Sequence, residues 1–577
     1  MTVNTTTVEV IKGGLIYAAE EMGIALRKSA YSPNIKERMD HSCAIFDHER
    51  RLISQAEHIP VHLGSMAFAI REGLNHYREK LNEDDMILFN DPYLSGTHLP
   101  DLTLIAPIFH DGCLIGYAAN KAHHVDVGGK APGSLAGDST ELFQEGFIIP
   151  PVRFVCRGVV DAQLAEVFKS NVRTPETQMG DLRAQIAANN TGIWRFRDLV
   201  EEHGVETVHG AMVEIMNYSE RRIRTEIDSI PDGVYVASDL MEDTGAGGGP
   251  VEIAVEITVE GSDLTFDYSG TSEQVEGPVN APLGVTIAGI YYTLISITDP
   301  TIPINDGCFR PVTLQIPRGC MMNPIRPAPV AGGNVETSQR NVDVLLRALS
   351  QAVPDTVPAA SQGTMNNVCI GGIDEDSCPW TFYETIGGGS GGRLGSDGID
   401  GIHVHMTNTM NTPIEALEAY LPLRFEAYRL IMDSGGPGRW RGGCGIERIW
   451  KLLTSKATLS VLAERTKIPP WGLLDGGPGA LGEYLIRRVN GTTENLPSKC
   501  TVTMKQGDIL IIRTPGGGGY GDPLDRNPIS VLKDVLNGLV SLEAAERDYG
   551  VVLDVQYMKV NVEETEQLRR ARRKPMP

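Results

Sequence analysis

Two histidines and an aspartate between Phe89 and Gly129 have the residue types and spacing of a metal site. They are His98, Asp101 and His123. Imidazole nitrogen and carboxylate oxygen suit Zn²⁺, Mn²⁺ or Fe²⁺, and mixed N/O ligand sets with room for water are typical of catalytic sites. The alternative is that these are ordinary polar loop residues, with one histidine hydrogen-bonded in the core. Spacing alone leaves both interpretations open.

A β-hairpin would bring the three residues together. Its strands are expected in two apolar stretches, residues 102–109 and 114–121. Asp111-Gly112 favours a two-residue turn, since both central residues need φ > 0. With that pair at the centre, Pro100 faces His123. Strict alternation would place Asp101 on the other face, but Pro100 interrupts the ladder there and could re-aim it. The sequence therefore predicts convergence at the open end of the hairpin.

Composition narrows the class of protein. A net charge of −23 over 577 residues argues against nucleic acid or an anionic membrane as the main partner. No stretch approaches 18 uninterrupted apolar residues, so no membrane span is expected. The nine cysteines are scattered without a C-x-x-C pair, and no signal peptide is visible. These features predict a cytoplasmic protein with reduced thiols.

The chain is expected to have an α+β fold. A mixed N-terminal metal-binding domain with helices is followed by a large β-rich region and a short helical C-terminus. Helices are expected at 8–30, 64–80 and through most of 162–230. After Pro231-Asp232-Gly233 the chain alternates apolar and polar residues, as in VEIAVEITVEG. We therefore predict three ranges: 1–230, 231–527 and 528–577.

Several separated motifs together resemble those of the hydantoinase B/oxoprolinase family. They are ERMDHSCAIFD (37–47), NDPYLSGTHLPD (90–101), HHVDVGG (123–129), GGNVETSQR (332–340), TNTMNTPIE (407–415), SGGPGRWRGGCG (434–445) and PGGGGYGDP (515–523). The likeness runs from roughly residue 5 to residue 550. Size, and the lack of a fused ATPase half, make the chain similar to the separate B (β) subunit of an N-methylhydantoinase- or caprolactamase-type enzyme.

The resemblance implies a metal site, a cofactor and a partner. Its motif match assigns the metal to Asp40, His98, Asp101 and His123, with Zn²⁺ first and Mn²⁺ or Fe²⁺ as alternatives. It places ATP and Mg²⁺ on an α (A-type) subunit with an actin/hexokinase-like fold, in an α₂β₂ assembly by family likeness, and it implies a small cyclic amide substrate. The present sequence has no G-x-x-x-x-G-K-[ST] loop. Whether bicarbonate takes part stays open.

These expectations suggest a division of labour. An unstrained cyclic amide is resonance-stabilised and has a poor leaving group. A metal can lower the pKa of bound water toward ~7 or polarise the amide oxygen, and ATP on the partner can phosphorylate that oxygen. The leading hypothesis is therefore the metal-bearing subunit of an ATP-dependent cyclic amide hydrolase. Three alternatives remain: an acetone-type carboxylase subunit, a non-catalytic scaffold, and a metallohydrolase that needs no partner.

Other polar residues near the hairpin receive weaker roles. His124 and Asp126 would lie on the face opposite His123 in a regular strand. We expect His124 in the core or behind a ligand, and Asp126 could bond to a ligand histidine. Asp91 begins the loop and could cap it, a catalytic role being the less favoured alternative. Three residues could line the cleft, but nothing in the sequence decides it: Glu57, His58 and His62.

Two patterns farther along the chain are expected to be structural. Residues 388–392 match G-x-S-x-G around Ser390, but a nucleophile elbow needs a flanking strand and helix, so a flexible turn is favoured. His403 and His405 resemble an amidohydrolase H-x-H, but the barrel pattern is missing, so strand residues are expected. Residues in the later family motifs could bind an anion or shape turns, and both alternatives stay open: Glu336, Thr337, Ser338, Asn411 and Thr412.

Overall fold

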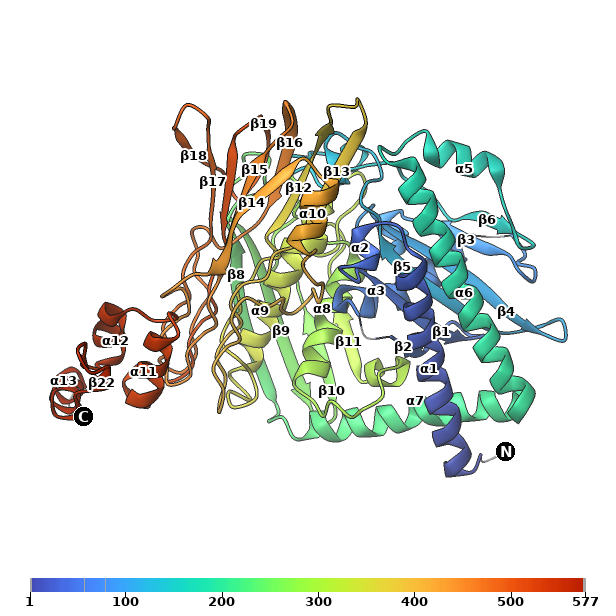
Figure 1. Cartoon of the computed structure of the whole chain (residues 1–577). Coiled ribbons are helices and arrows are strands. Elements are labelled where there is room, and N and C mark those ends of the chain that lie inside the picture. Colours follow the sequence, from blue (N-terminus) through green and yellow to red (C-terminus); the bar gives the residue numbers. More distant parts are fainter. Residues whose placement is uncertain (1–2, 57, 78, 574–577) are drawn as a thin grey trace.

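The computed structural model describes residues 3–56, 58–77 and 79–573 and has a mixed helix-and-sheet architecture (Figure 1). Its N-terminal part is built on an antiparallel seven-stranded sheet, in the order β2-β1-β5-β4-β3-β6-β7. The strands are β1 (His41–Asp47), β2 (Leu52–Gln55), β3 (Met86–Phe89), β4 (Asp101–His110), β5 (Cys113–His123), β6 (Val152–Cys156) and β7 (Val159–Val160). The hairpin expected from the sequence is β4–β5, at the middle of this sheet.

Helices cover both faces of the sheet, so its central strands are buried over most of their length. On one face Ile45 and Leu104 pack with α1 (Thr5–Ser29) and α6 (Pro175–His203). On the other face Phe46 and Ile105 pack with α3 (Pro60–His76). The long helix α7 (Val205–Asp228) leads out of this layer into the rest of the chain. The predicted N-terminal helices are confirmed, with ends a few residues from those expected.

The hairpin turn is as predicted, but its register changes along the strands. Asp111 and Gly112 have φ of 50° and 76°, and His110 pairs with Cys113. Between Ile108 and Phe109 the register shifts, and from there on each residue of β4 opposes a residue one position farther along β5 than a regular ladder would give. Pro100 is therefore not what re-aims the aspartate: the bulge is.

The middle of the chain contains the expected strands and two helices that were not expected. A four-stranded sheet has the order β11-β10-β9-β8. Its strands are β8 (Gly233–Met241), β9 (Val251–Glu260), β10 (Asp263–Asp267) and β11 (Val312–Gln315). Helices α8 (Leu283–Ser296) and α9 (Ser338–Leu349) pack in the same hydrophobic core. A π-helical turn, Gly333–Thr337, leads directly into α9.

Two further sheets pack around a hydrophobic core of their own. Their orders are β13-β12-β16-β19 and β14-β15-β20-β17-β18. The strands are β12 (Asn367–Ile373), β13 (Pro379–Glu384), β14 (Leu423–Leu430), β15 (Ile446–Leu452), β16 (Lys456–Leu462), β17 (Glu483–Arg487), β18 (Thr493–Asn495), β19 (Lys499–Lys505) and β20 (Ile509–Arg513).

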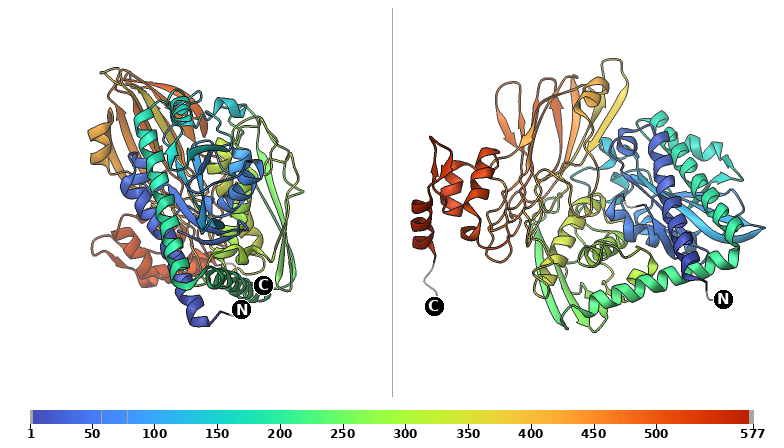
Figure 2. Two further views of the ribbon diagram at one scale, coloured as in Figure 1. Left: turned by 90° about the vertical axis from the view of Figure 1, so that its right-hand side faces the viewer. Right: turned by 60° about the horizontal axis from the view of Figure 1, so that its bottom comes forward.

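The C-terminal helices form a small unit at the end of the molecule opposite the N-terminal sheet (Figure 2). They are α11 (Pro528–Leu536), α12 (Leu542–Tyr549) and α13 (Val562–Arg572), and α11 and α12 supply most of a separate apolar cluster. The division into 1–230, 231–527 and 528–577 remains a proposal about domains. None of the helices in the described part of the chain is both long and apolar enough to cross a membrane.

Candidate metal centre

Three neighbouring strands bring predicted ligands to one end of the sheet. Strand β5 lies between β1 and β4. His123 ends β5, Asp101 begins β4 directly opposite it, and Asp40 immediately precedes β1. The main-chain N–H of His123 donates to the carbonyl of Asp40 at 3.0 Å. His98 reaches the same point from the loop before β4. The side chain of Asn90 holds this loop by donating to the carbonyl oxygen of Leu99.

The ligand atoms of three residues converge. His98 Nε2 lies 3.1 Å from Asp101 Oδ1 and 3.0 Å from His123 Nδ1, and the latter two atoms are 3.0 Å apart. All three side chains are buried. Asp101 Oδ1 can accept from both rings, but the two donating nitrogens would then lie only 3.0 Å apart, whereas one cation can take a lone pair from all three atoms. Ligands ~2.1 Å from one ion and ~90° apart would be separated by ~3.0 Å, so the group fits a divalent metal.

Asp40 lies at the same small cavity but outside this triangle. It lines a space of about 20 Å³ together with His98, Asp101 and His123. Burial raises the pKa of Asp40, and the charges of His123 and Arg38 oppose that effect. The Arg38 guanidinium is 3.8 Å from its carboxylate. The structure thus places all four predicted residues together, while their roles as metal ligands stay a prediction.

His62 lies behind the ligands, a position that the sequence left undecided. It is buried, and its Nε2 is 3.6 Å from Asp101 Oδ2. Its Nδ1 is 3.0 Å from the hydroxyl oxygen of Ser42 on β1. This places His62 where it can orient the second oxygen of the Asp101 carboxylate, as residues behind metal ligands commonly do.

The cover of the site comes from distant parts of the chain. Tyr383 on β13 stacks on the His123 ring, with centroids 4.5 Å apart. Its hydroxyl donates to Asn367 Oδ1 at 2.9 Å. Asn334, on the π-helical turn, lines the cavity with a buried Oδ1 that has no hydrogen-bond partner. No local pattern in the sequence marks these residues, because only the tertiary fold brings them to the hairpin.

The π-helical turn depends on a glycine. A Cβ on Gly333 would lie only 1.8 Å from the carbonyl oxygen of Asn280. Glycine therefore lets this turn approach a neighbouring loop closely. Single π-helical turns are frequent at functional sites, and this one presents Asn334 to the cavity.

Two residues that follow His123 serve the framework. His124 lies between Gln178 Oε1 at 2.6 Å and Gln185 Oε1 at 3.0 Å on α6, in the core as expected. The suggested bond between Asp126 and a ligand histidine is wrong. The Asp126 carboxylate instead accepts bonds from Arg173 and from main-chain N–H groups of its own loop.

The remaining candidates lie outside the triangle of ligand atoms. Asp91 caps the short helix α4 (Pro92–Ser95) by accepting from the N–H of Tyr93. Ser390 lies in an irregular glycine-rich segment and accepts from the N–H of Ile399, without the flanking strand and helix of a nucleophile elbow. His403 and His405 are not strand residues as expected: His405 has φ of 52°, which a regular strand excludes. Glu57 lies outside the described residues.

Residues of the later family motifs make structural bonds. Glu336 accepts hydrogen bonds from the N–H of Met365 and from the side chain of Asn367. Asn367 in turn accepts from the Tyr383 hydroxyl, so Glu336 and Tyr383 are linked through Asn367. The side chain of Asn411 donates to the carbonyl of Thr385. These bonds support the turn-shaping alternative, while anion binding at these residues stays untested.

Known proteins resemble this chain over nearly its full length. It is 47% identical to an uncharacterised protein of Methanocaldococcus jannaschii, over 98% of this chain and 99% of that protein. It is 36% identical to a Pseudomonas protein provisionally named as the B component of a D-/L-hydantoinase, over 97% and 98%. It is 37% identical to the 5-oxoprolinase of Saccharomyces cerevisiae, over 88% of this chain but only 41% of that longer enzyme.

Solved structures and a family profile agree with these relatives. The fold superposes on a chain of the ATP-dependent caprolactamase from Pseudomonas jessenii with a TM-score of 0.92 and 29% identity, covering 99% of this chain and 100% of that one. An acetone carboxylase chain gives the same TM-score at 21% identity, covering 99% of this chain and 84% of that one. This similarity shows a shared fold. The profile described as hydantoinase B/oxoprolinase matches residues 4–523. The chain therefore belongs to the hydantoinase B/oxoprolinase family.

Proposed function

We propose that this chain is the metal-carrying β component of an ATP-dependent hydrolase that opens the C–N bond of a small cyclic amide. The observation that carries the proposal is the buried convergence of His98, Asp101 and His123. The relatives named for hydantoinase, 5-oxoprolinase and caprolactamase activity supply the reaction class. Cytoplasmic location is part of the same proposal.

The residues around the site would hold a metal ion, orient its ligands and shield it from solvent. When bound, a divalent ion supplies Lewis acidity that polarises an amide oxygen or makes water more acidic. His98, Asp101 and His123 would hold the ion, with Asp40 as a further candidate. His62 orients the Asp101 carboxylate, and Tyr383 fixes the His123 ring. Asn334 also lines the cavity, and among the described residues its buried Oδ1 has no hydrogen-bond partner.

The donor set bears on which metals could bind. Two imidazole nitrogens and a carboxylate oxygen suit Zn²⁺, Mn²⁺ or Fe²⁺.

ATP-dependent activation is assigned to a partner. The chain corresponds to 41% of the single-chain yeast 5-oxoprolinase, so the remainder of that enzyme has no counterpart in it. An A-type subunit carrying ATP and Mg²⁺ would complete the enzyme, and we propose two copies of each subunit. Bicarbonate would take part as a substrate only in the alternative function as a carboxylase subunit.

Reconstitution tests the proposal. The metal-loaded chain, an A-type subunit, ATP and Mg²⁺ are incubated with hydantoin, ε-caprolactam or 5-oxoproline, and ring-opened product and ADP are measured. Product that requires both subunits and ATP supports the proposal. ATP-dependent fixation of labelled bicarbonate onto a ketone would favour the carboxylase instead. Ring opening by this chain alone without ATP would refute the division of labour.

A further inference from the structure

The metal cavity is too small for a cyclic amide, but a larger cavity adjoins it. The metal cavity, at about 20 Å³, has room for a single water molecule. A second cavity of about 240 Å³, which we term the side chamber, shares Ile59 with it. The residues that define the side chamber include Ser42, His58, Ile59, Tyr292, Ile295 and Ile304. Pockets for drug-sized ligands begin at roughly 300 Å³, so the side chamber suits a compact ring.

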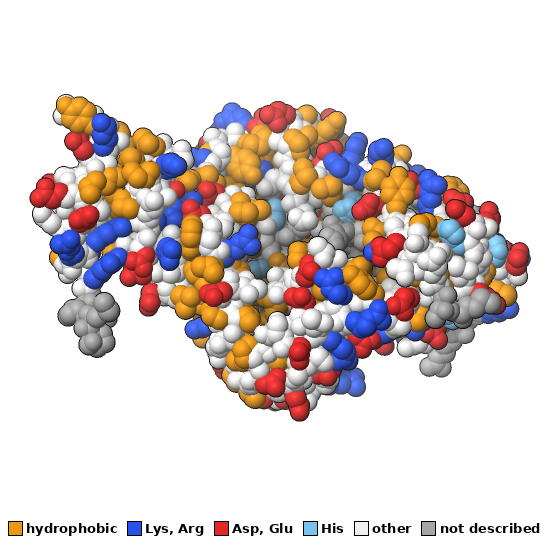
Figure 3. Space-filling view, turned by 90° about the horizontal axis from the view of Figure 1, so that it is seen from below, with side chains coloured by type: hydrophobic (Ala, Val, Ile, Leu, Met, Phe, Trp, Pro, Cys, Tyr) orange, Lys and Arg blue, Asp and Glu red, His pale blue; other side chains and the backbone are white. Residues whose placement is uncertain are grey.

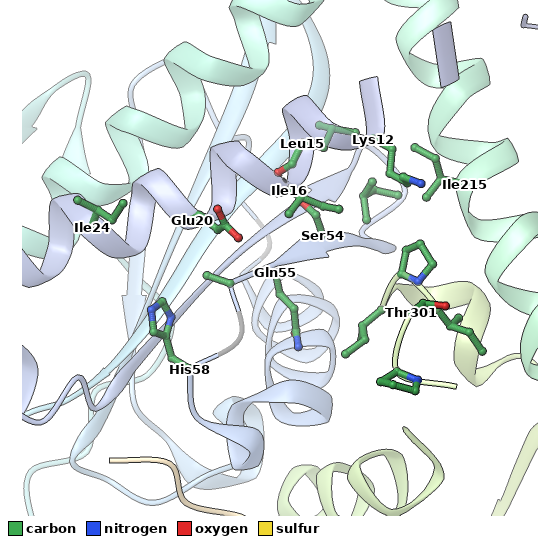
Figure 4. A pocket seen from close by; sticks show the side chains of 16 residues that line it. Lys12, Leu15, Ile16, Glu20, Ile24, Ser54, Gln55, His58, Ile215 and Thr301 are labelled. Atoms are coloured by element: carbon green, nitrogen blue, oxygen red, sulfur yellow. Dashed lines mark hydrogen bonds between the residues drawn. The ribbon is translucent and has the colours of Figure 1, made fainter. Parts of the chain in front are cut away.

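The side chamber opens outward through a wider groove. This outer groove has a volume of about 640 Å³ and shares Gln55, His58 and Ile304 with the chamber. Seen from below, histidine side chains lie within a hollow near the middle of the molecule (Figure 3). Figure 4 shows Gln55 and His58 below α1, with Thr301 on the other side of the groove. The outer groove, the side chamber and the metal cavity thus form a series in which neighbours share lining residues.

The inner part of this series is lined without a cationic side chain. Among the described residues, none lining the side chamber or the metal cavity is Lys or Arg, and Lys12 lines only the outer groove. Burial lowers the pKa of His58, which keeps its ring neutral near pH 7. The charge of a bound divalent ion would be offset by the carboxylates of Asp40 and Asp101. A ligand carboxylate in the side chamber would therefore lose its hydration without an uncompensated positive charge beside it, which is unfavourable.

We infer that the substrate is an uncharged cyclic amide, a lactam or hydantoin whose ring carries no carboxylate, and that it binds in the side chamber. Tyr292, Ile295 and Ile304 offer an apolar wall for ring methylenes. Ser42 and Asn408 offer neutral groups that match an amide N–H and C=O. The inference rests on the proposed function and adds to it the charge of the substrate.

One exposed arginine is the rival site for a substrate carboxylate. A neighbouring cavity of about 420 Å³ shares Tyr292 and Asn408 with the side chamber. Arg393 lines this cavity, as does Asp397. If Arg393 bound a carboxylate, 5-oxoproline would be favoured, so the test has to include this residue.

Two ligands with the same ring isolate the effect of charge. 2-Pyrrolidinone and 5-oxoproline share a five-membered lactam and differ only in the carboxylate. In the reconstituted enzyme with ATP we expect kcat/KM for 2-pyrrolidinone to exceed that for 5-oxoproline roughly tenfold or more. Calorimetric titration of the metal-loaded chain with each ligand gives a second readout that needs no turnover.

A charge placed in the chamber wall should change the preference. Ile295 is partly exposed, so Ile295→Arg adds a cation there and Ile295→Met is the uncharged control. We expect the arginine variant to lower the 2-pyrrolidinone/5-oxoproline ratio and the methionine variant to leave it unchanged. The inference is overturned if the wild type prefers 5-oxoproline, and most clearly if Arg393→Gln abolishes that preference. It is also overturned if the wild type binds the two ligands equally or binds neither. Failure to open any ring counts against the proposed function, whereas the titration still decides the charge preference.

Discussion

Asp101 and His123 oppose each other directly across the β4–β5 hairpin, with Oδ1 and Nδ1 3.0 Å apart. The pairing depends on the bulge between Ile108 and Phe109 near the turn. In a regular ladder from the same turn, His123 would oppose Pro100, and the two side chains would project from opposite faces of the sheet. An irregularity at one end of the hairpin therefore creates the ligand pair at the other.

Removing two ligands should remove the metal. We expect the wild type, purified without chelator, to hold about one transition-metal ion per chain, as a three-ligand site with open positions would. The His98→Ala/His123→Ala variant should hold none. Plasma mass spectrometry measures the metal content of both proteins. The control variant His110→Ala, at the opposite end of β4 from Asp101, should keep the metal. A wild type without metal would leave the scaffold hypothesis as the better account.

The aromatic cover should affect how tightly the metal is held. Tyr383→Leu removes the ring stacked on His123, whereas Tyr383→Phe keeps the ring and loses only the bond to Asn367. Loss of groups that orient metal ligands commonly costs 10- to 100-fold in metal affinity. We expect a loss of about this size for the leucine variant and a smaller one for phenylalanine. Competition with a fluorescent chelator measures both, and equal affinities would contradict the orienting role.

Asn334 should affect turnover and leave the metal in place. Its Oδ1 lines the cavity without a hydrogen-bond partner. We expect Asn334→Ala to lower kcat of the reconstituted enzyme by roughly 10- to 100-fold, because a polar group is lost beside the metal cavity, which has room for a single water molecule. Metal content should stay at the wild-type level. The exposed Asn75 on α3 gives a control variant, Asn75→Ala, that should be fully active. Unchanged kcat in Asn334→Ala would rule out a positioning role.

The pH dependence of stability should report on Glu336. Burial raises its pKa to about 8 from an ordinary value of 4.5. The folded protein therefore keeps a proton that the unfolded chain releases, so this stabilising contribution is complete below pH 4.5 and is lost as the pH rises to about 8. The slope reaches at most ~1.4 kcal/mol per pH unit. Glu336→Gln should flatten the fall in melting temperature between about pH 5.5 and 7.5. Parallel curves for the two proteins would contradict this assignment.

Breaking a buried ion pair should destabilise the C-terminal sheets. Arg448 on β15 pairs with Glu384 on β13, and both side chains are fully buried. Arg448→Met leaves the Glu384 charge without its partner and should cost about 3–5 kcal/mol. Adding Glu384→Gln should recover part of that loss. Urea unfolding measures each variant. The exposed Arg429 provides the control, since Arg429→Met should cost no more than ~1 kcal/mol.

The sequence predicts the convergence of His98, Asp101 and His123 because its signals are local, whereas Asp40 enters the predicted ligand set only through the family resemblance. Asp111-Gly112 fixes the turn, and His98, Asp101 and His123 lie close to it in the chain. The bulge that sets their register has no comparable signal, because nothing in the apolar run around Ile108 marks one residue as extra. Tyr383 and Asn334 reach the site from other sheets and helices, so no spacing rule could select them.

That α8 was not expected from the sequence follows from its apolar composition. Helix α8 lies inside the core that joins the middle sheet to α9, and it is apolar over most of its surface. A helix buried all round loses the 3.6-residue alternation that identifies an amphipathic helix, and its β-branched residues resemble a buried strand. The exposed strand β9, with one buried and one solvent-facing side, keeps its two-residue alternation and is predicted correctly.

The position of Tyr383 over His123 also sets an order of events during synthesis. The three ligand residues leave the ribosome long before Tyr383 and Asn334, so the hairpin can form and meet an ion while its outer side is still open to water. Once β13 and the π-helical turn are in place, they cover the site. An ion bound at the hairpin would then exchange in the finished protein only when these later segments separate from it.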